Sequence, residues 1–211
     1  MARTLSKRRA EAARRLEKLV ESEINDLAMK SSFRIDRTQS EEERDWNASG
    51  IDQVVYMIST NPGEPMRQLE HIASGGELSR VMLALKASVE SGNPASRKTG
   101  APGKRGVPQK TLVFDEIDTG IGGRAAEAVG KKLKSLSRAN QVLCVTHLPQ
   151  IATFADQHYV IEKKESAGRT RTGIRLVTGD ERTEEVARML SGAKLTETSR
   201  KHAEQMIKAN A

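Results

Sequence analysis

The chain has 211 residues and a net charge of +7; 36% of its residues are hydrophobic and 3% are aromatic. No apolar run approaches the ~20 residues of a membrane-spanning helix, and no apolar segment of a signal peptide follows the basic N-terminus. The single cysteine, Cys144, excludes an internal disulfide and a cysteine-rich metal site. We therefore expect one sizeable core, with or without an appendage, in a cytoplasmic protein.

The positive charge is concentrated in two segments. Residues 1–20 contain seven basic and two acidic residues, and residues 92–110 contain five basic and no acidic residues. The rest of the chain therefore carries a net charge of −3. A basic chain suggests a nucleic-acid partner, but charge confined to a helix and a loop is also typical of a solvated face.

The N-terminal elements are predicted from periodicity. Residues 1–30 carry apolar side chains at spacings of three, four or seven, which predicts a helix. Such a helix is typical of the end of a coiled-coil arm, or of a helix that packs on a partner helix. Residues 33–37 and 51–60 predict strands, separated by a polar loop and followed by a turn at 61–65.

The stretch 71–86 joins a glycine-bearing turn to an apolar helix. Ser74 and Glu77 have the spacing of a capping box, and Gly75 and Gly76 let the backbone approach a ligand closely. The free N–H groups and positive dipole end of such a helix suit a phosphate; a capped core helix without a ligand is the alternative. We expect its buried face to contain Leu78, Val81, Met82, Leu85 and Val89.

The second half of the chain predicts a strand–helix–strand core. Residues 92–109 are rich in Gly and Pro and predict a flexible insertion. Two short apolar runs, 111–117 and 141–147, suit buried parallel strands on either side of a helix at 124–138. This order predicts an α/β fold. The remaining elements are predicted as a short helix at 149–156, a hairpin at 158–165 and 170–178, and helices at 181–191 and 196–209.

Three polar side chains follow these two predicted strands. Ligands of open α/β sheets bind beyond the carboxyl ends of the strands, where Asp115, Glu116 and His147 are expected. Asp115 can hold Mg²⁺ through oxygen, Glu116 can polarise a water, and His147 can contact a phosphate. A hydrogen-bonded strand end is the alternative for each of them.

Taken together and in this order, the motifs resemble the C-terminal half of an ABC-type ATPase. Ser74–Glu77 resembles the signature motif, Thr111–Glu116 the Walker B strand and catalytic glutamate, Asp118 the D-loop and His147 the switch histidine. The longer stretches HIASGGELSRVMLALK and QVLCVTHLPQIATFADQHYVIEK closely resemble the RecN family, SMC-like bacterial proteins of DNA double-strand break repair and recombination. The resemblance covers nearly the whole chain apart from 92–109.

This resemblance implies a C-terminal lobe of an ABC/SMC-type ATPase head at residues 31–211, with a mostly parallel sheet flanked by helices, and the end of a coiled-coil arm at 1–30. A phosphate-binding G-x-x-x-x-G-K-[S/T] loop (Walker A) is absent from the sequence. In the resembled family this loop lies in the N-terminal lobe. The implied partners are therefore that lobe, a second head in a homodimer, and DNA, with ATP and Mg²⁺ as cofactors, at the nucleoid and without a membrane.

In such a dimer the signature motif of one head would contact the nucleotide held by the other. This motif comprises Ser74, Gly75, Gly76 and Glu77. The other implied site residues are the general base Glu116, the magnesium ligand Asp115, the D-loop residue Asp118 and the γ-phosphate contact His147. Two alternatives remain open, a transporter ATPase subunit and a non-catalytic DNA-binding module derived from a head lobe. We expect this chain alone to bind ATP weakly and not to hydrolyse it.

Overall fold

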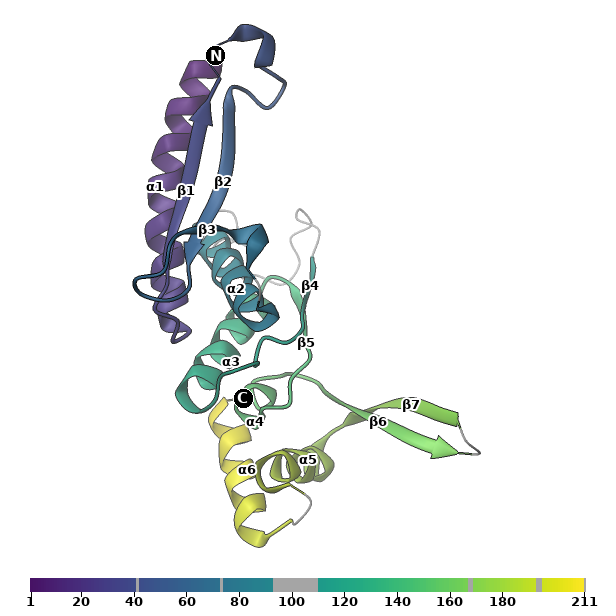
Figure 1. Cartoon of the computed structure of the whole chain (residues 1–211). Coiled ribbons are helices and arrows are strands. Elements are labelled where there is room, and N and C mark those ends of the chain that lie inside the picture. The colour runs from purple at the N-terminus through teal and green to yellow at the C-terminus, as the bar shows by residue number, and fades with distance from the viewer. Residues whose placement is uncertain (41, 73, 93–109, 167–168, 193–194, 211) are drawn as a thin grey trace. The chain divides into compact units, whose positions relative to one another are not determined.

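The computed structural model describes residues 1–40, 42–72, 74–92, 110–166, 169–192 and 195–210 (Figure 1). The predicted insertion at 92–109 lies outside these residues from position 93 onward. The chain divides into two compact units. The first contains Met1–Gly120 and Leu136–Cys144, and the second contains Ile121–Ser135 and Val145–Ala211. Within the described ranges, none of the helices combines the length and apolar character that a membrane crossing requires.

The first unit begins with a long helix that lies along a β-hairpin (Figure 1). The helix α1 spans Ala2–Asp26, and the strands β1 (Ser32–Gln39) and β2 (Asp52–Ser59) pair antiparallel. A two-residue strand, β3 (Arg67–Gln68), pairs with the other edge of β2. Short 3-10 turns occur at Glu43–Asp45 and Leu69–His71. The helix and both strands predicted from periodicity are thus confirmed.

Two glutamates of α1 cover the outer edge of β1. Glu21 accepts a hydrogen bond from the Phe33 amide at 3.0 Å, and Glu17 accepts one from the Ile35 amide at 2.7 Å. Four residues of a helix rise about 6 Å, close to the rise of two residues in a strand. The two carboxylates therefore meet alternate amides of an edge that would otherwise be open to further strand pairing.

The helix α2 spans Gly75–Gly92 and packs against α1. Its predicted buried face is partly wrong, because Met82 and Val89 are 37% and 56% exposed. Small side chains on the other face allow the close approach to α1, while Met82 lines an open groove between α2 and β4. The buried residues of its described part are Gly76, Arg80, Val81, Leu83, Ala84, Ala87 and Ser88.

The strands β4 (Thr111–Phe114) and β5 (Gln141–Cys144) pair in parallel, as the sequence predicts. Their predicted burial is only partly right, since Phe114 is buried but Val113 is 66% and Leu143 49% exposed. A two-stranded sheet is too narrow to bury both of its faces. The α/β class is confirmed, and among the described residues parallel pairing is confined to β4 and β5 while the other strands pair antiparallel.

The second unit combines helices with one hairpin. The strands β6 (His158–Ser166) and β7 (Arg169–Val177) form the predicted antiparallel hairpin. Val186 and Ala203 are fully buried where the last two helices meet. The helices are α3 (Gly123–Ser137, its last two residues counted with the first unit), α4 (Pro149–Ala152), α5 (Gly179–Ser191) and α6 (Glu197–Asn210).

Candidate functional site

The predicted signature segment lies at the start of α2. The Ser74 hydroxyl accepts a long hydrogen bond, 3.4 Å, from the Glu77 amide, which is one half of the predicted capping box. Gly76 is buried, and a Cβ atom there would lie 2.9 Å from the Thr119 Cβ and 3.0 Å from the Glu116 carbonyl oxygen. A Cβ atom at Gly75 would collide with the Glu116 carboxylate. The two glycines therefore let this helix start lie directly against the segment that follows β4.

That segment, residues 115–119, is called the acidic turn below. Asp115 and Glu116 are exposed, and Asp118 is buried at 4% exposure. Glu116 has a φ of 56°, a left-handed conformation that costs a residue with a Cβ about 1–2 kcal/mol. Its amide donates to the Asp115 carboxylate at 2.9 Å, and its carbonyl accepts from the Thr119 amide at 3.1 Å. The candidate general base thus lies at a strained position inside a closed turn.

Two consecutive side chains of α2 hold the acidic turn by its main chain. The Ser79 hydroxyl donates to the Asp115 carbonyl at 2.8 Å. The Arg80 Nη1 donates to the carbonyls of Ile117 and Thr119 at 3.2 and 2.8 Å. Three carbonyls of one five-residue turn are therefore bonded by the helix that begins at the signature segment.

Arg80 is only 6% exposed. Its Nε also contacts the sulfur of Met29 at 3.4 Å. Burial lowers the pKa of the Arg80 guanidinium, whereas the carboxylates of Glu77 and Asp118 raise it. An arginine keeps its charge in proteins, so a fixed positive charge lies beneath the acidic turn.

The carboxylates of the acidic turn affect the pKa of Cys144, which lies at the end of β5. Burial, followed by the negative charges of Asp118 and Asp115, raises the pKa of its thiol to about 12. Both carboxylates thus disfavour a further negative charge at the carboxyl end of the β4–β5 pair. Such a potential favours a cation.

A magnesium ion fits this end of the strands only in part. Among the described residues, no group of three or more His, Cys, Asp or Glu side chains could hold a metal ion. Mg²⁺ in phosphate-transferring sites usually takes one or two carboxylates, with phosphate oxygens and waters for the rest. The exposed Asp115 carboxylate fits one such ligand position.

His147 belongs to the second unit and is exposed there. The helix α4 begins two residues later, and a partly buried arginine bonds the carbonyls at its C-terminal end. Arg182 of α5 donates through Nη2 to the carbonyls of Ala152, Thr153 and Ala155, at 3.4, 3.2 and 2.8 Å. Burial lowers the pKa of the Arg182 guanidinium.

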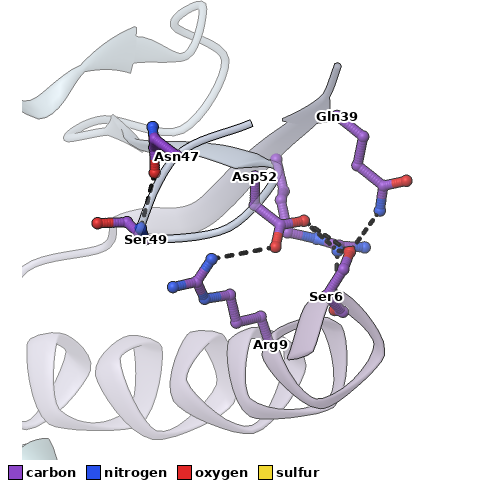
Figure 2. A network of polar contacts seen from close by, with 7 residues as sticks. Ser6, Arg9, Gln39, Asn47, Ser49 and Asp52 are labelled. Atoms are coloured by element: carbon purple, nitrogen blue, oxygen red, sulfur yellow. Dashed lines mark hydrogen bonds and ion pairs between the residues drawn. The ribbon is translucent and has the colours of Figure 1, made fainter. Parts of the chain in front are cut away.

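Sequence reasoning missed a polar cluster around Asp52, the first residue of β2 (Figure 2). The buried Asp52 carboxylate accepts hydrogen bonds from Ser6 at 2.7 Å, Arg37 at 2.8 Å and Arg9 at 3.2 Å. The Gln39 amide donates to the Ser6 hydroxyl at 2.7 Å. Burial alone would raise the pKa of Asp52, but the hydrogen bonds from Ser6, Arg9 and Arg37 hold it below its ordinary value.

The chain is similar over nearly its whole length to bacterial proteins named DNA repair protein RecN. It is 38% identical to the protein from Halalkalibacterium halodurans over 94% of this chain and 33% of that protein. It is 39% identical to the protein from Streptomyces coelicolor over 98% of this chain and 36% of that protein. The chain thus resembles the RecN proteins over nearly its whole length. It spans about a third of the length of these RecN relatives.

One solved structure supports the fold of this chain. The crystal structure of an Smc head domain with a coiled coil and joint, derived from Pyrococcus yayanosii, matches 88% of this chain and 30% of that chain. The TM-score is 0.52 at 20% sequence identity. No protein-family model matches the chain. The roles of Ser74, Gly75, Gly76 and Glu77, and those of Asp115, Glu116, Asp118 and His147, remain predictions.

Proposed function

We propose that this chain supplies the signature motif and the acidic turn of a RecN-like ATPase head that acts in DNA double-strand break repair. The observation that carries the proposal is the packing of the α2 start on the acidic turn, where a Cβ atom on Gly76 would lie only 3.0 Å from the Glu116 carbonyl oxygen. A helix start offers unpaired N–H groups and a positive dipole end to a phosphate. The names of the RecN relatives support the assignment to DNA repair.

Each candidate site residue would have a separate role in ATP hydrolysis. Ser74 and the amides of Gly75 and Gly76 would bind the γ-phosphate of a nucleotide held mainly by a second head, with Glu77 fixing the helix start. The remaining residues would act on the nucleotide of their own head. Glu116 would accept a proton from the attacking water, Asp115 would hold Mg²⁺, Asp118 would order the dimer contact, and His147 would contact the γ-phosphate. Mg²⁺, when bound, would neutralise charge on the phosphates.

A partner lobe carrying a Walker A loop is the second requirement of this proposal. Val113 and Leu143 expose one face of the β4–β5 pair, and Met82 and Val89 expose part of α2. Val113 pairs with Leu143 and lines a groove together with Met82, and exposed apolar surface of this kind marks an interaction site. The proposal assigns this surface to the N-terminal lobe, which would widen the parallel sheet. Without that lobe the chain has no loop to hold the β- and γ-phosphates.

The test combines the purified chain with the Walker A-bearing lobe and measures phosphate release from ATP. We expect hydrolysis by the combination, at least a hundredfold less by the chain alone, and loss of activity in the combination on Glu116→Gln. Robust turnover by the chain alone that Glu116→Gln abolishes would overturn the trans arrangement. A combination that binds DNA but never hydrolyses ATP would favour the non-catalytic alternative.

A second variant tests the direction of the signature contact. Ser74→Arg in the complete protein should block ATP-dependent head dimerisation in light scattering and leave ATP binding to each head within about twofold. Its control is Ser49→Arg, an exposed serine of a surface turn in the same unit. Loss of ATP binding in Ser74→Arg would mean that the motif contacts the nucleotide of its own head, which would contradict the proposed contact with the other head.

A DNA contact is the second candidate function for this chain, and one observation favours it. Six basic residues of α1 are exposed, while Arg9 is engaged by Asp52. Binding of a DNA duplex through phosphate contacts should fall steeply between 50 and 200 mM salt, by about tenfold or more. The exposed residues are Arg3, Lys7, Arg8, Arg14, Arg15 and Lys18. Salt-independent binding, or binding unaffected by Arg14→Gln with Arg15→Gln, would count against it.

A further inference from the structure

The side chains of Ser79 and Arg80 lie between two parts of the proposed site that sequence motifs treat separately. The signature segment opens α2, and the acidic turn follows β4, more than thirty residues later along the chain. Within the first unit they touch through Gly76 and are bonded through Ser79 and Arg80. The two parts therefore form one body that cannot rearrange without breaking these hydrogen bonds.

We infer that Arg80, assisted by Ser79, is a positioning residue that holds the acidic turn, and with it Glu116 and Asp118, in register with the signature segment. This inference rests on the proposed function and adds to it the residue that couples the two motifs. This role requires no contact between Arg80 and the nucleotide or the attacking water. It acts through the main chain of the turn.

Three physical arguments support a positioning role over plain packing. First, Arg80 is 6% exposed, and burying a guanidinium is costly unless its donors are paired. Second, its partners are the carbonyls of Ile117 and Thr119, on either side of Asp118, so the bonds fix the conformation of that residue. Third, a methionine or leucine would avoid the desolvation cost but could not donate to these carbonyls, so the site uses the donors of the guanidinium.

The hydrogen bonds from Ser79 and Arg80 flank the strained backbone of Glu116. A φ of 56° at a residue with a Cβ persists only when its surroundings fix it. Ser79 bonds the carbonyl before Glu116, and Arg80 bonds two carbonyls after it. Loss of Arg80 would let Glu116 relax to a right-handed or extended conformation, which would turn its carboxylate and the Asp118 peptide away from their present positions.

The arrangement has a consequence for the proposed dimer. The signature segment of one head would contact the nucleotide of the other head, whereas Glu116 would act on the nucleotide of its own head. Arg80 would then link the two nucleotides through a single side chain. A phosphate seated on the α2 start would stabilise the acidic turn, so hydrolysis would depend on closure of both heads.

The test compares Arg80→Met, Arg80→Lys and the exposed-site control Arg138→Met in the complete protein, this chain with its Walker A-bearing lobe. We expect Arg80→Met to lower kcat per ATP-binding head at least tenfold and to leave KM within twofold. Arg80→Lys keeps one donor and should recover part of kcat, and Arg138→Met should match the unmodified protein. Because rates are counted per ATP-binding head, unfolded protein does not contribute. An unchanged kcat per binding head in Arg80→Met, or a loss confined to KM, would overturn the inference.

A second measurement separates this inference from the proposed function. In the 211-residue chain, the Thr119 amide donates to Glu116 and should be protected from hydrogen exchange. Arg80→Met should speed its exchange at least tenfold, and Arg138→Met should not. Unmodified complete protein without ATPase activity would defeat the proposed function, yet this exchange rate would still decide whether Arg80 holds the turn. Equal protection of Thr119 in both variants would overturn the positioning role.

Discussion

The first unit buries two charges in contrasting ways. Asp52 is surrounded by donors on the side chains of α1 and β1, namely Ser6, Arg9 and Arg37. Arg80 is surrounded by carbonyls of a single turn. The Asp52 cluster therefore attaches one secondary-structure element to another, whereas the Arg80 contacts fix the conformation of one loop. The comparison predicts that loss of Asp52 costs mainly stability, and that loss of Arg80 costs mainly activity.

The largest stability effect should come from Asp52→Ala. Its carboxylate is fully buried between two guanidinium groups, and removing one partner of a buried ion pair typically costs about 3 kcal/mol or more. Urea denaturation of the chain measures the change. Asp36→Ala, at an exposed position of β1, should cost about 0.5 kcal/mol or less. Equal costs for the two variants would show that the Asp52 cluster does not anchor α1 to the hairpin.

Gly76→Ala should have the next largest effect, at about 2 kcal/mol. The added methyl group would lie 2.9 Å from the Thr119 Cβ and 3.0 Å from a main-chain oxygen, and a packed site accommodates such a group only by shifting backbone. Gly122→Ala is the matched control, because no atom lies within 4 Å of its Cβ position. Hydrogen exchange at Thr119 should rise in Gly76→Ala alone. A neutral Gly76→Ala would mean that the α2 start does not press on the acidic turn.

Glu17→Ala should cost about 1–2 kcal/mol, since it leaves the Ile35 amide of an edge strand without its carboxylate acceptor. Glu17→Gln keeps an acceptor oxygen and should cost less. Amide exchange at Ile35 reports the loss directly, with Phe33 as the internal control because Glu21 still bonds it. Faster exchange at both amides would indicate that α1 detaches as a whole instead of losing one contact.

The comparison also shows which features were accessible from sequence. Side-chain patterns predicted the helix α1, the strands β1 and β2, the β6–β7 hairpin and the parallel β4–β5 pair, because side-chain spacing follows directly from helix and strand geometry. Burial was predicted less well. Val113 and Leu143 are apolar yet exposed, since an apolar pattern does not reveal which neighbour covers it.

The candidate site shows the same division. The motifs identified Ser74, Glu116 and Asp118 as candidate site residues, but nothing in the sequence predicted the contacts of Arg80 or Asp52. Both depend on partners far apart along the chain: Arg80 bonds Thr119, and Asp52 bonds Ser6. The one available signal was a charged residue at position 80, four residues from both Gly76 and Ala84 on a helix face of small side chains.

The smallest effect concerns the reactivity of Cys144. Its thiol pKa of about 12 lies above the ordinary 9.0, so the reactive thiolate should be about a thousandfold scarcer at pH 8. Alkylation by iodoacetamide should therefore be slow and should accelerate with rising pH up to that pKa. Asp118→Asn removes one of the negative charges that raise the pKa and should speed the reaction, whereas Asp36→Asn, at an exposed position of β1 outside the acidic turn, should not. Equal rates in both variants would mean that burial alone sets the Cys144 pKa, and the acidic turn would then exert no negative potential on the end of β5.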